Sequence, residues 1–85
     1  MHNYKKLNVW ISSISLVKNI YNLTRKFPKE EMFVLTQQLR RAAISIPSNI
    51  SEGYERDSKN QFLYFLVIAK GSCGELRTQL EIAFN

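Results

Sequence analysis

The chain has 85 residues, a formal net charge of +5, one cysteine and one histidine. A single cysteine excludes an internal disulfide, a single histidine excludes a zinc cluster of conventional spacing, and the length excludes more than one domain. A lone chain this short buries only about 60% of the surface that its unfolded form exposes. Since small domains compensate with disulfides, metals or self-association, the composition favours self-association.

The first predicted element is a helix over about residues 6–26, where apolar residues recur at steps of three and four. One apolar row contains Leu7, Trp10, Ile11, Ile14, Val17 and Tyr21, and a neighbouring row contains Val9, Leu16, Ile20, Leu23 and Phe27. Two rows indicate either a helix that is covered on more than one side or a broad stripe in a small bundle.

A helix break and a new helix start are predicted around Pro28. Proline is tolerated in a first turn, because the amides there lack an intrahelical partner. Glu30 and Glu31 then lie at the positive end of the next helix dipole, while Arg25 and Lys26 lie at the negative end of the preceding one. The second helix is therefore predicted over about residues 30–56.

This second segment carries Pro47 in its middle, where proline costs about 3 kcal/mol relative to alanine. The apolar row nevertheless keeps its phase on both sides of the proline: Phe33 or Leu35, Leu39, Ala42 or Ala43, Ile46 and Ile50. A single helix kinked at Pro47 is favoured over two short ones. Hydroxyl groups of Ser48 or Ser51, or water, could bond the backbone groups freed at the kink.

The third helix is predicted over about residues 58–83. Ser58 and Gln61 have the spacing of a capping box, in which the hydroxyl accepts the amide of the third helical residue and the glutamine returns to the cap amide. The core row is Phe62, Phe65 or Leu66, Ala69, Cys73, Leu76, Leu80 and Ala83, and Leu63, Val67 and Ile68 widen it. Since the row stays in phase past Gly71 and Gly74, we interpret these glycines as a point of close helix packing. The fold class is all-α: an up-and-down helical bundle in one domain, residues 1–85.

The stretch "KFPKEEMFVLTQQLRRAAISIPSNISEGYERDSKNQFLYFLVIAKGSCGELRTQL" (residues 26–80) closely resembles the four-helix bundle proteins associated with 23S rRNA intervening sequences. Residues 4–23 also fit the first helix of that family loosely. The resemblance implies antiparallel helices and assembly as five-fold rings. One branch of the family comprises accessory variability proteins of diversity-generating retroelements, which bind nucleic acid and partner a reverse transcriptase. Two departures are Ser51, where the family pattern has alanine, and the family's fourth helix, which this sequence does not reach.

No catalytic or metal centre is predicted. Cys73 lies on the apolar row with no histidine near it in sequence, and His2 is a lone terminal histidine. Carboxylate pairs such as Glu52 with Glu55, or Glu75 with Glu81, are typical of solvated helix faces, and the Glu-x-x-His pattern of metal-binding bundles is absent. We therefore expect no enzyme activity, no metal and no cofactor.

The basic residues carry the functional prediction. Arg40 and Arg41 point about 100° apart on a helix, so at least one must reach solvent, a subunit boundary or a phosphate. A structural ion pair with Glu52, Glu75 or a neighbouring subunit is the alternative to phosphate contact. The candidate nucleic-acid-binding residues are Lys18, Arg25, Lys26, Lys29, Arg40, Arg41, Arg56, Lys59, Lys70 and Arg77.

The predicted function is binding of RNA or DNA by a homo-oligomer, in the form of a pentamer, as an accessory to a nucleic-acid enzyme such as a reverse transcriptase. Copies in a ring add their positive charges and their weak phosphate contacts. The alternative is a structural homo-oligomeric scaffold that binds another protein and no nucleic acid. The longest apolar run, Phe62 to Ala69, is far below the roughly 20 residues that cross a bilayer. We expect a cytoplasmic protein with no membrane partner.

Overall fold

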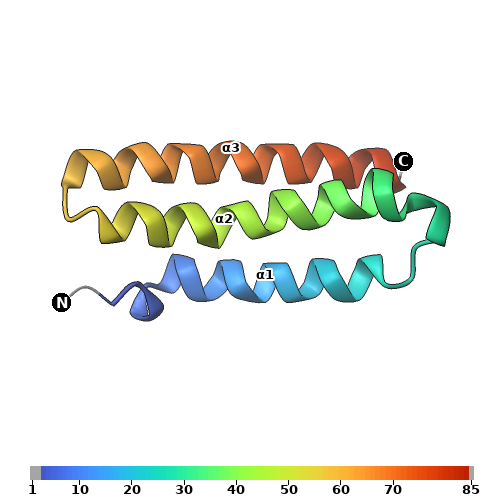
Figure 1. The fold of residues 1–85 in the computed structure, drawn as a ribbon, viewed down its shortest axis with the longest axis horizontal. Coiled ribbons are helices and arrows are strands. Elements are labelled where there is room, and N and C mark those ends of the chain that lie inside the picture. Colours follow the sequence, from blue (N-terminus) through green and yellow to red (C-terminus); the bar gives the residue numbers. More distant parts are fainter. Residues whose placement is uncertain (1–2, 85) are drawn as a thin grey trace.

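Three long helices form the chain, each antiparallel to its predecessor (Figure 1). The computed structural model describes residues 3–84, so His2 lies outside the described part. The long helices are α1 (Asn8–Thr24), α2 (Gln37–Glu55) and α3 (Lys59–Phe84). Shorter turns are η1 (Tyr4–Lys6) and η2 (Lys29–Glu31), both 3-10, and η3 (Met32–Thr36), a π-helix that leads into α2. Residues 3–84 contain no strand, and the predicted all-α class is confirmed.

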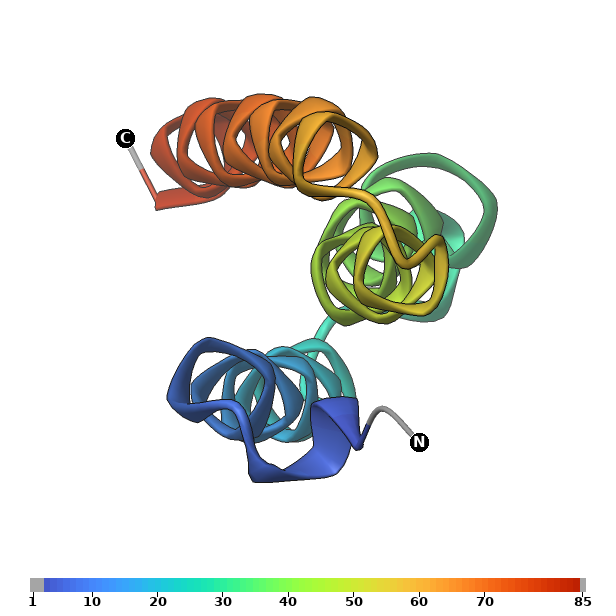
Figure 2. The same cartoon turned by 90° about the vertical axis from the view of Figure 1, so that its left-hand side faces the viewer.

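The helix α2 is the centre of the fold, because α1 and α3 both pack against it. Viewed along the bundle, α1 and α3 lie on two sides of α2 and leave one side open (Figure 2). The core follows from this arrangement, since most of its buried apolar side chains belong to α2. The buried apolar side chains of the whole core are Ile20, Leu39, Ala42, Ala43, Ile46, Ile50, Ala69 and Leu76.

The π-helix η3 determines which of Phe33 and Leu35 packs against the core, which periodicity left open. Leu35 packs against the core, whereas the side chain of Phe33 is 85% exposed. A π turn contains an extra residue relative to an α turn, so an apolar row that is extrapolated backwards at α spacing loses its phase there. Phe33 therefore lies outside the core and is available for another role.

A single helix continues through Pro47, as the phase of the apolar row predicted. Pro47 is buried, and two polar side chains bond backbone carbonyls beside it. The hydroxyl of Ser51 donates to the carbonyl of Ser48 (3.0 Å), and the amide of Asn49 donates to the carbonyl of Ser45 (2.8 Å). The bend at Pro47 stays a prediction.

Replacing Pro47 with alanine is expected to keep α2 and to raise the helical signal in far-UV circular dichroism. Alanine supplies the amide that proline lacks and relieves its clash with the preceding turn, although the buried ring contacts are lost. Light scattering on the same variant measures whether assembly changes. A mass equal to that of the parent chain would contradict any role of a bend in shaping the oligomer.

The α2–α3 connection contains the predicted cap. The hydroxyl of Ser58 accepts the amide of Gln61 (3.3 Å), and α3 begins at the next residue. Within residues 3–84, the side chain of Gln61 makes no return bond, so only half of the capping box forms. Asp57 has φ 57°, the left-handed conformation that reverses the chain between the two helices.

The predicted role of Gly71 and Gly74 is wrong within this chain. A Cβ added at either position would meet no atom of another described element within 4 Å, so both glycines face away from α2. The close approach lies instead at Gly53 in α2, where an added Cβ would lie 2.6 Å from Cβ of Phe65 in α3. A hydrogen bond of 2.6 Å between the hydroxyls of Ser45 and Ser72 joins the same two helices further along.

Candidate nucleic-acid interface

The structure separates the predicted basic residues into groups. Arg25, Lys26, Lys29, Arg40 and Arg41 belong to the end of the bundle where α1 passes into α2, and Arg56 and Lys59 belong to the opposite end. Lys18 is exposed on α1, and Lys70 and Arg77 are exposed on α3. The first group is the largest, so its surroundings decide what the basic surface can bind.

Arg40 is fixed in place by α1. Its Nε donates to the hydroxyl of Thr24 (2.9 Å), and its guanidinium lies 4.4 Å from the centre of the Tyr21 ring. Thr24 is itself anchored, because its hydroxyl donates to the carbonyl of Ile20 (2.7 Å) and the residue is only 2% exposed. The predicted ion pair with Glu52 or Glu75 does not form in the described part of the chain, and the charge of Arg40 stays uncompensated by an acidic side chain.

Arg40 and Arg41 line one cleft of about 290 Å³, which we call the arginine cleft. The other lining residues are Tyr21 from α1, Met32 and Phe33 from η3, and Gln37 and Ile44 from α2. Acidic side chains are absent from this lining. Periodicity placed Tyr21 on an apolar row and Phe33 on another as an alternative to Leu35, and only the π turn and the tertiary contacts place them beside the two arginines.

Arg56 is a weaker candidate, because its charge is already compensated. Its Nε donates to a carboxylate oxygen of Glu52 at 2.8 Å, and its guanidinium lies 5.1 Å from the centre of the Phe65 ring. Both side chains of the ion pair are about half exposed, so the pair adds little stability, but it lowers the positive potential at this end of the bundle.

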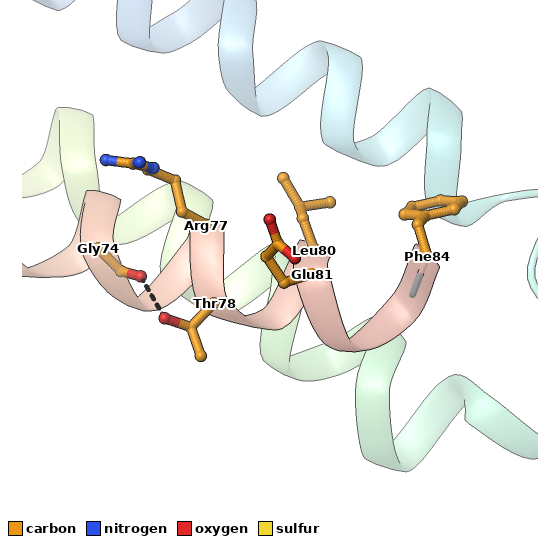
Figure 3. A pocket seen from close by; sticks show the side chains of 6 residues that line it. All are labelled: Gly74, Arg77, Thr78, Leu80, Glu81 and Phe84. Carbon is orange, nitrogen blue, oxygen red and sulfur yellow. Dashed lines mark hydrogen bonds between the residues drawn. The ribbon is translucent and has the colours of Figure 1, made fainter.

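Arg77 borders a hollow in the last turns of α3, which Figure 3 shows from close by. The hollow has a volume of about 680 Å³ and is lined by Gly74, Arg77, Thr78, Leu80, Glu81 and Phe84. Thr78 donates to the carbonyl of Gly74 (2.9 Å), and Phe84 meets Phe27 edge to face at 6.0 Å between ring centres. The hollow is lined by the carboxylate of Glu81 as well as by Arg77, which makes it less suited to a phosphate than the arginine cleft.

The comparison with known families fits this helical architecture. The family model described as 23S rRNA-intervening sequence protein matches residues 5–85. The chain belongs to this family. The resemblance seen in the sequence is thus confirmed over nearly the whole chain, while no curated protein sequence matches it.

The described residues of this chain offer less support for other kinds of site. Cys73 is half-buried and packs against the core. Among residues 3–84, no three histidine, cysteine, aspartate or glutamate side chains gather where they could hold a metal ion. No helix in that range combines the length and the apolar character needed to cross a bilayer.

Proposed function

We propose that this chain is a non-catalytic cytoplasmic protein that binds RNA or DNA as a homo-oligomer. The observation that carries the proposal is the arginine cleft, where two guanidinium groups share one lining that contains no carboxylate. A net charge of +5 on 85 residues adds a long-range attraction for polyanions. Arginine binds phosphate oxygens in a bidentate manner, and backbone phosphates are present in every sequence of either nucleic acid.

Self-association is supported by apolar side chains that the single chain leaves exposed. Val67 is 68% exposed, Leu63 is 49% exposed and Ile68 is 36% exposed, and all three belong to the widened row of α3. The open side between α1 and α3 also contains a groove of about 480 Å³. Apolar surface of this extent favours burial against another copy, and the family resemblance favours five-fold rings.

A ring would strengthen the binding of nucleic acid without any new contact. Each copy contributes its own arginine cleft, so weak phosphate contacts act together through effective concentration. Because such binding tolerates any sequence, the ring could serve as an accessory to a nucleic-acid enzyme such as a reverse transcriptase. A reverse transcriptase gene next to the gene for this chain would support that role, and an rRNA gene around it would favour the intervening-sequence branch instead.

Polynucleotide binding is expected to weaken steeply as salt is added. Each phosphate contact contributes about 0.7 to the slope of log affinity against log salt on a single strand and about 0.9 on a duplex. Fluorescence anisotropy with labelled RNA and DNA measures the slope, and light scattering on the same samples measures the mass. A chain that assembles but binds no polynucleotide at low salt would instead be a scaffold for another protein.

A further inference from the structure

The arginine cleft combines an aromatic surface with two positive charges at the α1–α2 end of the bundle. Phe33 belongs to the π-helix and is 85% exposed, which is unusual for a large apolar side chain with a core close by. Exposing such a side chain gives up the stabilisation that burial in the core would provide. Met32 and Val34 on either side are also exposed, at 42% and 62%. The backbone of η3 therefore directs these three side chains outward, and Met32 and Phe33 line the cleft beside the arginines.

Arg40 supplies a cation whose position is already set. Its contacts with Thr24 and Tyr21 restrict the side chain, so little rotamer freedom remains to be lost when a ligand binds. Those contacts use Nε and one face of the guanidinium, which leaves the terminal nitrogens for an acceptor. Arg41 is exposed and adds a second cation to the same lining.

A ligand that matches this lining carries an anionic group next to a flat, unstacked ring. In duplexes both faces of a base are covered by its neighbours, whereas single strands can turn a base outward onto an aromatic side chain. Gln37, which also lines the cleft, offers an amide that can bond a base edge. The lack of acidic lining residues matches a phosphate and disfavours a basic peptide.

Building on the proposed function, we propose that the arginine cleft binds one nucleotide of single-stranded RNA or DNA. The base stacks on Phe33, and the adjoining phosphate contacts Arg40 and Arg41. This arrangement gives a preference for single strands over duplexes, which a merely basic surface does not provide.

The test compares Phe33→Ala with the full parent chain, using a fluorescein-labelled oligo(U) and a labelled RNA duplex of the same length. Phe33→Ala is expected to weaken oligo(U) binding about 5- to 150-fold, since stacking one base on an aromatic ring contributes about 1–3 kcal/mol. Duplex binding should stay unchanged. Phe33→Trp should preserve the oligo(U) affinity, and so should Tyr64→Ala, which removes a 60% exposed aromatic side chain from α3.

The charge contribution is measured separately by the salt dependence. Arg41→Gln is expected to reduce the slope of log affinity against log salt by about 0.7, the contribution of one phosphate contact on a single strand. Arg41→Lys and Phe33→Ala should both keep the slope of the parent chain. Circular dichroism and light scattering on every variant monitor the fold and the mass.

The outcomes test separately whether the arginine cleft binds a nucleotide and whether the chain binds polynucleotides at all. Equal oligo(U) affinity in Phe33→Ala and the parent chain overturns the assignment of the cleft, while polynucleotide binding itself stands. A lower mass in Phe33→Ala assigns the face to contacts between copies and also overturns it. A parent chain that binds neither probe at low salt overturns both proposals.

Discussion

Replacing Leu39 with alanine is expected to lower the free energy of unfolding by about 2–5 kcal/mol, the range for large-to-small substitutions in well-packed cores. Leu39 is 0% exposed and lies on α2, between the two helices that pack against it. Its neighbours along the buried face of α2, Ala42 and Ala43, have short side chains that cannot extend into the space left behind. Since domains of this kind are stabilised by only about 5–15 kcal/mol, the loss is a large fraction of the total.

A matched control is Leu63→Ala on α3, which removes the same atoms from a side chain that is 49% exposed. In the single chain this change should cost well under half as much as Leu39→Ala, because little packing is lost. Urea unfolding followed by circular dichroism measures both variants at two protein concentrations. Equal losses at the lower concentration would contradict the assignment of Leu39 to the centre of the core. A loss for Leu63→Ala that grows with concentration would place Leu63 at a contact between copies.

Local signals in the sequence predicted the helices well. The apolar row kept its phase across Pro47, and α2 indeed continues through the proline. The spacing of Ser58 and Gln61 located the start of α3 to within one residue. Such signals depend only on residues that are close together in the sequence, so helices can be predicted from them without knowledge of the tertiary arrangement. Helix ends near 24 and 55 fell within two residues of their predicted positions.

Features that depend on tertiary contacts could not be predicted in the same way. The π turn of η3 exposes Phe33 and packs Leu35 against the core, and no spacing rule distinguishes these alternatives. For a similar reason, the close helix approach lies at Gly53 and not at Gly71 and Gly74, where it was predicted. Whether a glycine faces a neighbouring helix depends on the relative rotation of two elements, which periodicity on one element does not specify.

The candidate site was predicted in part. The basic residues could be read from the sequence, but their electrostatic surroundings could not. The contact between Arg40 and Thr24 joins residues 16 positions apart on two helices. One signal was available and was missed: Glu52 and Arg56 have the i,i+4 spacing of a helical ion pair, which compensates Arg56.

Alanine at Gly53 is expected to destabilise the chain by up to about 2 kcal/mol, although alanine is the better helix former. The added Cβ would lie 2.6 Å from Cβ of Phe65 and 3.3 Å from Cα of Phe62, so α2 and α3 must move apart. Overpacking of this kind costs about 1–3 kcal/mol, whereas the gain in helix propensity is about 1 kcal/mol. Neither contact involves the flexible end of a side chain, and the cost therefore exceeds the gain.

Gly74→Ala is the matched control, and the expected change has the opposite sign. With no atom within 4 Å of the added Cβ, only the helix propensity acts, and the free energy of unfolding should rise by about 0.5–1 kcal/mol. Thermal unfolding of both variants, with the mass measured by light scattering, checks the pair. Stabilisation by Gly53→Ala would contradict the close α2–α3 contact. Destabilisation by Gly74→Ala together with a lower mass would mean that another copy covers this part of α3, because a clash then requires a neighbour that the single chain does not supply.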